Sequence, residues 1–147
     1  MVTKLRTGGF CVLMCALFSV GHAEDVSDAE GCQSHFTIEG NFLTGKKFST
    51  WVLLSGATKA DAYSRVYSRV ANDGWSILNA DKDAGIISAA QGVLYGRGSQ
   101  VPMTIIVEAA GRGSRVAVTF RTGGAQMAKE DTIRTKLCSY LASAVSP

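Results

Sequence analysis

The sequence predicts a single α+β domain over residues 36–147, in which an antiparallel sheet of about five strands carries two helices on one face. Three observations predict this class. Residues 59–73 place apolar side chains at helical spacing, residues 75–121 alternate β-forming stretches with Gly-rich turns, and residues 127–145 return to helical spacing. The element order is then β-α-β-β-β-β-α. A sheet with one apolar face is most simply covered by both helices on that face.

The first 23 residues differ from the rest of the chain. Lys4 and Arg6 precede an apolar stretch from Phe10 to Val20, and Gly21-His22-Ala23 places small residues where signal peptidase reads them. The apolar stretch is well short of the roughly 20 residues that a membrane-spanning helix needs. We therefore expect a signal peptide over residues 1–23, cleavage near Ala23, and a periplasmic or secreted protein without a spanning segment.

Cleavage of the signal peptide lowers the net charge of the chain, and net charge indicates which kinds of partner the chain can bind. The chain has 15 Lys and Arg against 12 Asp and Glu, a formal net charge of +3. Without Lys4 and Arg6, 13 basic residues face 12 acidic ones, so the expected mature chain is nearly neutral. Binding of nucleic acid through a broad basic surface is therefore disfavoured.

The cysteines predict one disulfide. Cys11 and Cys15 lie in the predicted signal peptide, which leaves Cys32 and Cys138 as a pair in an exported protein. Such a bridge closes a long loop and would stabilise the fold by about 4–5 kcal/mol in the chain-entropy model. A redox-active pair is the alternative, but the sequence has no C-x-x-C, so we expect a structural role.

Residues 24–35 are predicted to form an acidic, poorly ordered leader. Phe36–Ile38 and Phe42–Leu43 suggest a short extended segment or hairpin, followed by a turn at 44–47. The β-formers from Phe48 to Leu54 predict a strand of the sheet.

The helix over residues 59–73 has signals at both ends. Thr58 is placed as N-cap, with Asp61 three residues on, close to a capping box. Gly74 is placed as the left-handed residue that ends the helix, and Trp75 packs back on the last turn. The apolar stripe comprises Tyr63, Val66, Tyr67, Val70 and Ala71. We expect the arginines on its other face to be solvated.

Four further strands and a final helix follow. The strands are predicted at residues 75–79, 86–95, 101–109 and 115–121, with turns between them at 80–85, 96–99 and 111–114. The helix over 127–145 has an apolar stripe of Ile133, Leu137, Tyr140, Leu141 and Ala144, with Cys138 beside it.

Motifs that could carry chemistry are weak. After cleavage His35 is the remaining histidine, and it has no evident partner for nucleophilic catalysis or for zinc, which needs three or four ligands. Residues 79–85 resemble a calcium loop, but their glycine arrives one residue late and the twelfth position is Ala90 rather than Glu. The two Gly-Arg-Gly-Ser copies, 96–99 and 111–114, lie between strands and are predicted as hairpin turns rather than phosphate cradles. We predict no catalytic residue, no cofactor and no metal.

The stretch from Thr58 to Ala89 resembles the small helix-grip domains of bacterial envelope lipoproteins, such as that of the barrel-assembly machinery's C subunit. The resemblance rests on a helix ending in glycine before an Asp-x-x-x-Gly-x-Ile hairpin, here Gly74, Trp75, Ile77, Asp81, Gly85, Ile87 and Ala89. It implies a helix-grip fold and a non-enzymatic partner in an envelope assembly. The chain departs from that family in having no lipid-attachment cysteine and in carrying the Cys32–Cys138 pair.

Two functions follow as expectations. The first is an exported, non-enzymatic binding or assembly module that contacts an envelope protein through the outer face and edges of its sheet. The alternative is a carrier of a small apolar ligand or lipid, held between the sheet and the C-terminal helix. The candidate ligand or partner surface comprises Trp51, Tyr63, Tyr67, Trp75 and Tyr140. An enzyme is the least expected class.

Overall fold

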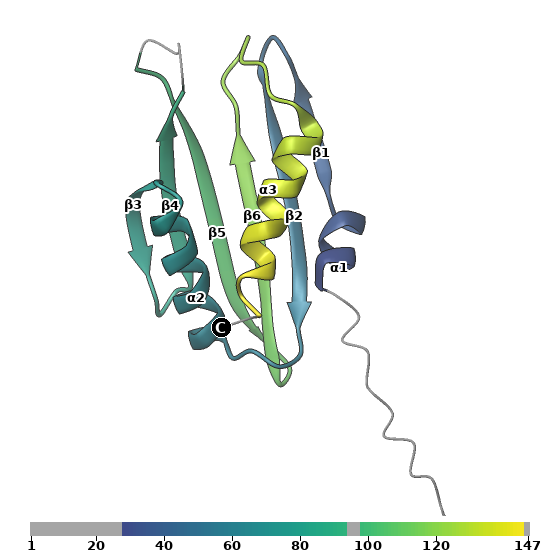
Figure 1. Ribbon diagram of the computed structural model, residues 1–147, viewed down its shortest axis with the longest axis vertical. Helices are drawn as coiled ribbons and strands as arrows, with labels where there is room; N and C mark the ends of the chain where they lie inside the picture. Colours follow the sequence, from purple (N-terminus) through teal and green to yellow (C-terminus); the bar gives the residue numbers. More distant parts are fainter. Residues whose placement is uncertain (1–27, 94–97, 146–147) are drawn as a thin grey trace, which may run out of the picture.

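The computed structural model describes residues 28–93 and 98–145, so the predicted signal peptide and its cleavage site lie outside the described residues. Nine helices and strands lie within these described residues and are labelled in Figure 1. They are α1 (Asp28–Ser34), β1 (Thr37–Asn41), β2 (Gly45–Leu54), α2 (Lys59–Asn72), β3 (Ser76–Asp81), β4 (Ile86–Gly92), β5 (Gln100–Ala110), β6 (Gly113–Arg121) and α3 (Glu130–Ala142). Among the described residues, no helix is long and apolar enough to cross a membrane.

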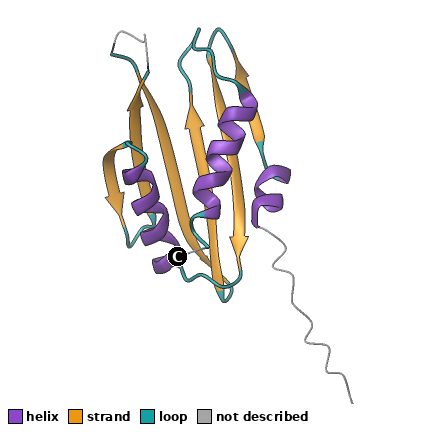
Figure 2. Cartoon of the chain, viewed as in Figure 1, coloured by secondary structure: helices purple, strands orange, loops and turns teal. Residues whose placement is uncertain are grey.

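All six described strands form one antiparallel sheet in the order β1-β2-β6-β5-β4-β3. The helices lie on one side of it (Figure 2). The core is the sheet face beneath them, where alternate residues of the central strands are buried: Phe48, Val52, Met103, Ile105, Val107, Val116, Val118 and Phe120. The predicted α+β class and antiparallel sheet are confirmed.

The prediction of about five strands and two helices was too low by one strand and one helix. The extra strand is β1, whose Asn41 pairs with Gly45, so β2 starts at Gly45 rather than after a turn at 44–47. Asn41 Oδ1 accepts hydrogen bonds from the backbone N–H groups of Leu43 and Thr44 at 2.9 and 3.0 Å, which fixes the tight connection. The turn therefore lies at 42–44.

The extra helix, α1, lies within the segment predicted as a poorly ordered leader. It packs on β2 and α3, and its Cys32 forms the predicted disulfide with Cys138 of α3, with 5.6 Å between the Cα atoms. Thr50 of β2 donates a hydrogen bond to the Cys32 carbonyl oxygen at 2.6 Å. A helix of 7 residues is not stable alone, so these tertiary contacts hold it.

Both predicted ends of α2 are confirmed. The Thr58 hydroxyl accepts a hydrogen bond from the Asp61 backbone N–H at 3.2 Å. At the other end Gly74 has a φ of +82°, and the backbone N–H of Trp75 donates to the carbonyl of Val70 at 3.4 Å, as a Schellman ending requires. The helix thus ends where the chain must turn back into β3.

Two turns that resembled ligand-binding motifs connect neighbouring strands as hairpin turns. The second Gly-Arg-Gly-Ser copy joins β5 to β6, and its Gly111 has a φ of +58°, the conformation that favours glycine in a tight hairpin. The first copy lies partly outside the described residues. In the turn after β3, Asp81 accepts a hydrogen bond from the Ala84 N–H at 2.8 Å and so caps its own loop.

Candidate ligand-binding site

The five aromatic side chains predicted as a ligand or partner surface do not gather at one place. Trp51 lies on the outer face of the sheet, away from the helices. Tyr63 and Tyr67 stack on α2 with 6.3 Å between ring centroids. Trp75 and Tyr140 are buried together between helix and sheet. They therefore belong to three separate environments.

Trp75 and Tyr140 pack against each other in the core. The indole N–H of Trp75 donates to the Tyr140 hydroxyl at 2.7 Å, and the Trp75 ring meets Phe120 edge-on, with 6.2 Å between centroids. Tyr140 is fully buried, and this burial raises the pKa of its hydroxyl to about 12. Both side chains belong to the hydrophobic core cluster.

An ion pair between α2 and α3 lies beside Tyr140. Lys136 Nζ of α3 lies 2.6 Å from a carboxylate oxygen of Asp73, the C-cap of α2, and Arg69 lies 3.7 Å from the other oxygen. The hydrogen bond from Lys136 is the main cause that holds the pKa of Asp73 below its usual value. The pair ties the end of α2 to the middle of α3.

A pocket of about 330 Å³ remains between the start of α3 and the adjoining end of the sheet. Its apolar wall is made by Val93, Val101, Phe120, Met127, Ala128 and Ile133, and its polar residues include Thr122, Gln126, Lys129 and Thr132. The volume is at the lower end of the about 300–1,000 Å³ typical of small-molecule sites. A second depression has a volume of about 590 Å³. All of its lining residues within the described ranges belong to α3, so no second element faces α3 across it.

The β6–α3 loop that forms one wall of the pocket is fastened to the β1–β2 hairpin. Lys46 N–H donates to Thr122 Oγ1 at 3.0 Å, and Thr122 N–H donates to the Lys46 carbonyl at 2.9 Å. Ala125 N–H donates to the carbonyl of Phe42 at 2.7 Å. The ion pair of Lys46 with Glu130, at 2.7 Å, fixes the first turn of α3. The wall is thus held from both of its ends.

Sequence reasoning missed the residues that form this end of the molecule. Met127 was predicted as the first residue of a helix, but α3 begins at Glu130, so Met127 lies in the loop and is 93% exposed. Phe42 and Leu43 were predicted as extended chain and instead occupy the β1–β2 turn, largely exposed. The available signal for this end of the molecule was the presence of bulky apolar residues beside the predicted turns, because such residues are usually buried.

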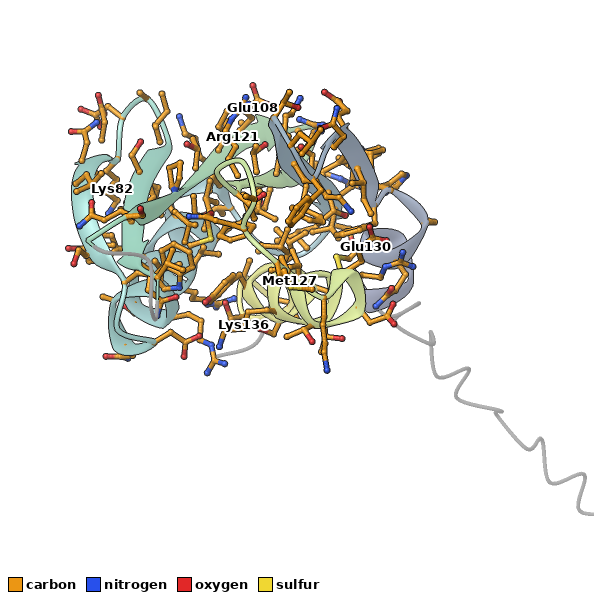
Figure 3. All side chains as sticks on the ribbon, turned by 90° about the horizontal axis from the view of Figure 1, so that it is seen from above. Lys82, Glu108, Arg121, Met127, Glu130 and Lys136 are labelled. Carbon is orange, nitrogen blue, oxygen red and sulfur yellow. A yellow bond between two sulfur atoms is a disulfide. The ribbon has the colours of Figure 1, made fainter. Side chains whose placement is uncertain are left out.

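The outer face of the sheet has a stacked cluster and an apolar row. The His35 ring stacks on Trp51 with 3.6 Å between centroids, and its Nδ1 lies 3.2 Å from the Trp51 carbonyl oxygen. The Arg115 guanidinium lies 4.8 Å from the Trp51 ring. A row of cross-strand neighbours, Trp51, Ala117, Ile106 and Ile86, continues the apolar surface over β2, β6, β5 and β4. Figure 3 shows Glu108 and Arg121 on this side, opposite α3.

Comparisons define the class of fold. No family model matches the chain, and no curated protein matches it. The architecture is an α+β domain with one antiparallel sheet, and a solved protein matches it. That protein is CalU16 from Micromonospora echinospora, known from a crystal structure, with a TM-score of 0.53 and 10% sequence identity over 74% of this chain and 80% of CalU16. This likeness shows the fold alone.

Proposed function

We propose that this chain is an exported, non-enzymatic binding module of the bacterial cell envelope that holds a small apolar ligand between α3 and the sheet. The observation that carries the proposal is the pocket of about 330 Å³, walled by strand ends on one side and by α3 and its preceding loop on the other. It lies in the layer where the sequence placed a carrier's ligand, but toward the start of α3 rather than among the predicted aromatics.

The lining indicates the chemistry of the ligand. Apolar side chains form the wall, and few polar groups are present to orient a ligand, as in most small-molecule sites. Lys129 and Thr132 lie at the rim, where an ammonium and a hydroxyl would favour a carboxylate or phosphate end group. An amphipathic molecule with a short apolar portion fits this arrangement.

Native mass spectrometry of the protein purified from its host's envelope tests the proposal. We expect a co-purifying ligand, released on denaturation. In vitro, the fluorescent apolar probe 1-N-phenylnaphthylamine should bind and brighten. Ala128→Phe places a ring in the pocket and should abolish that binding, whereas Ala142→Phe, at the exposed far end of α3, should leave it unchanged.

Equal probe binding by both phenylalanine variants would place the probe elsewhere and refute the pocket as the site. A protein that is empty by native mass spectrometry and also takes up no probe would refute the carrier function as a whole. Thermal unfolding of each variant establishes that the comparison is between folded proteins.

Contact with a protein partner is a second candidate, and the apolar row on the outer sheet face favours it. Leu53 and Ile106 on this face are 58% and 39% exposed. A photocrosslinking residue at Ile106, in the host, should capture a discrete partner, while the same residue at the exposed Ala142 of α3, on the opposite side of the sheet, should not. Indiscriminate or equal capture at both positions would argue against a specific surface.

A further inference from the structure

Three large apolar side chains are exposed at one end of the molecule. Phe42 and Leu43, in the turn between β1 and β2, are 49% and 80% exposed, and Met127 is 93% exposed. Met127 also lines the pocket, and Figure 3, which looks onto this end, places it beside the start of α3. We call Phe42, Leu43 and Met127 the apolar tip.

The two loops that carry the apolar tip are joined to each other. Besides the hydrogen bond from Ala125 to Phe42, Gly124 lies so close to the Leu43 carbonyl that a Cβ at Gly124 would overlap it. The Asn41 side chain fixes the turn from the other side. The backbone of Phe42 and Leu43 is therefore held against the loop that leads to Met127.

Four basic side chains lie near the apolar tip. Lys46, Lys47 and Arg121 line a depression together with Thr44 of the β1–β2 turn, and Lys129 lines the pocket together with Met127. Lys46 and Lys47 are neutralised by ion pairs with glutamates. Arg121 and Lys129 form no ion pair with any residue in the described ranges, and both are exposed. An apolar group flanked by free cations is complementary to a lipid headgroup layer, where phosphates lie above the acyl chains.

We propose that the apolar tip docks on an anionic phospholipid bilayer, with Phe42, Leu43 and Met127 inserted among the headgroups and Lys129 and Arg121 against the phosphates. Three side chains on two loops are too few for the roughly 800 Å² per partner of a stable protein interface, but such side chains suit shallow insertion. Docking places the pocket mouth toward lipid. That last step rests on the proposed carrier function, and the docking itself does not.

Binding to sedimented vesicles of phosphatidylglycerol and phosphatidylethanolamine tests the docking, with the full chain as its host produces it. The tip variant Leu43→Ser/Met127→Ser should bind about 100-fold more weakly, because each side chain contributes about a factor of ten. The matched control is Leu53→Ser/Leu78→Ser, which removes two leucines that are 58% and 64% exposed away from the tip. We expect the control to bind as the wild type does.

Electrostatics gives an independent readout. Arg121→Gln/Lys129→Gln should weaken binding to anionic vesicles and flatten its dependence on salt, while binding to pure phosphatidylcholine changes little. No binding of the wild type to anionic vesicles, or an equal loss in the tip and control variants, would overturn the docking proposal. Unchanged vesicle binding by the tip variant would also overturn it and would place the lipid contact elsewhere on the molecule.

The same proteins separate docking from ligand binding. Leu43→Ser, which does not line the pocket, should lose vesicle affinity and keep uptake of 1-N-phenylnaphthylamine in the absence of vesicles. Vesicle binding without any probe uptake would refute the carrier function and leave docking intact. Probe uptake without vesicle binding would refute docking and leave the carrier function intact.

Discussion

Removal of the disulfide gives the sharpest stability prediction. We consider Cys32→Ala/Cys138→Ala, which breaks a bridge between residues 106 positions apart. In the chain-entropy model a loop of that length constrains the unfolded state by about 4.7 kcal/mol. Small domains have total unfolding free energies of about 5–15 kcal/mol, so the loss is a large part of the total.

Urea unfolding followed by far-UV circular dichroism measures this loss. With a slope of about 2 kcal/mol per molar urea, the midpoint should fall by about 2 M. The wild type in the presence of a reductant should fall by the same amount. Hydrogen exchange should show that α1 loses protection first, because this short helix depends on its link to α3.

A decrease of less than about 1 kcal/mol in the free energy of unfolding would refute the reasoning. It would mean that the unfolded chain is already constrained without the disulfide. A much larger loss of unfolding free energy, with an unchanged dependence on urea concentration, would also contradict the prediction. It would show that α1 stabilises the sheet more through packing than through the disulfide. The slope itself should rise slightly, since the unlinked chain expands further when unfolded.

Three further predictions concern the core and the turns. Tyr140→Phe leaves the buried N–H of Trp75 without its partner and should destabilise the fold by about 1–3 kcal/mol in urea unfolding; no loss would mean that the N–H finds another acceptor. The pKa of Asp73 is lowered in the folded state, so its carboxylate stabilises the fold above the unfolded pKa, and this contribution is lost as pH falls through the folded pKa. Asp73→Asn should therefore flatten the decline of stability on acidification, and an identical acid limb would contradict this. Gly85→Ala, at a φ of +80° with a backbone oxygen against the new Cβ, should cost about 1–3 kcal/mol, whereas Gly56→Ala has open space and should change little; equal effects would refute the steric argument.

The sequence predicted the locally determined elements well. The limits of α2 follow from Thr58 and Gly74, which act within one turn of the helix. By contrast, β1 has an exposed, Gly-containing sequence and exists because β2 pairs with it, and α1 exists because of the disulfide and its packing. Because these two elements are stabilised by contacts with distant residues, the spacing of apolar residues in their own sequences does not reveal them.

The candidate site was less predictable. Trp51 lies in a stretch of mixed β-formers whose alternation does not reveal which side faces the helices, so its place on the outer face could not be deduced. Tyr140 was assigned correctly to the apolar stripe, but that stripe says only that the side chain is buried, not that it packs against Trp75. The pocket depends on where α3 starts, which is at Glu130, three residues after the predicted start at residue 127.

The order of strands constrains how this chain folds as it emerges N-terminus first. The strand β2 forms early but its inner neighbour is β6, the last strand made, so one side of β2 has no permanent partner until nearly the whole chain is present. The disulfide between α1 and α3 can likewise form only when nearly the whole chain is present, because its two cysteines are 106 positions apart. Native structure is therefore reached late, through contacts of high sequence separation, and the nascent chain presents an unpaired strand edge that a holding chaperone would have to shield.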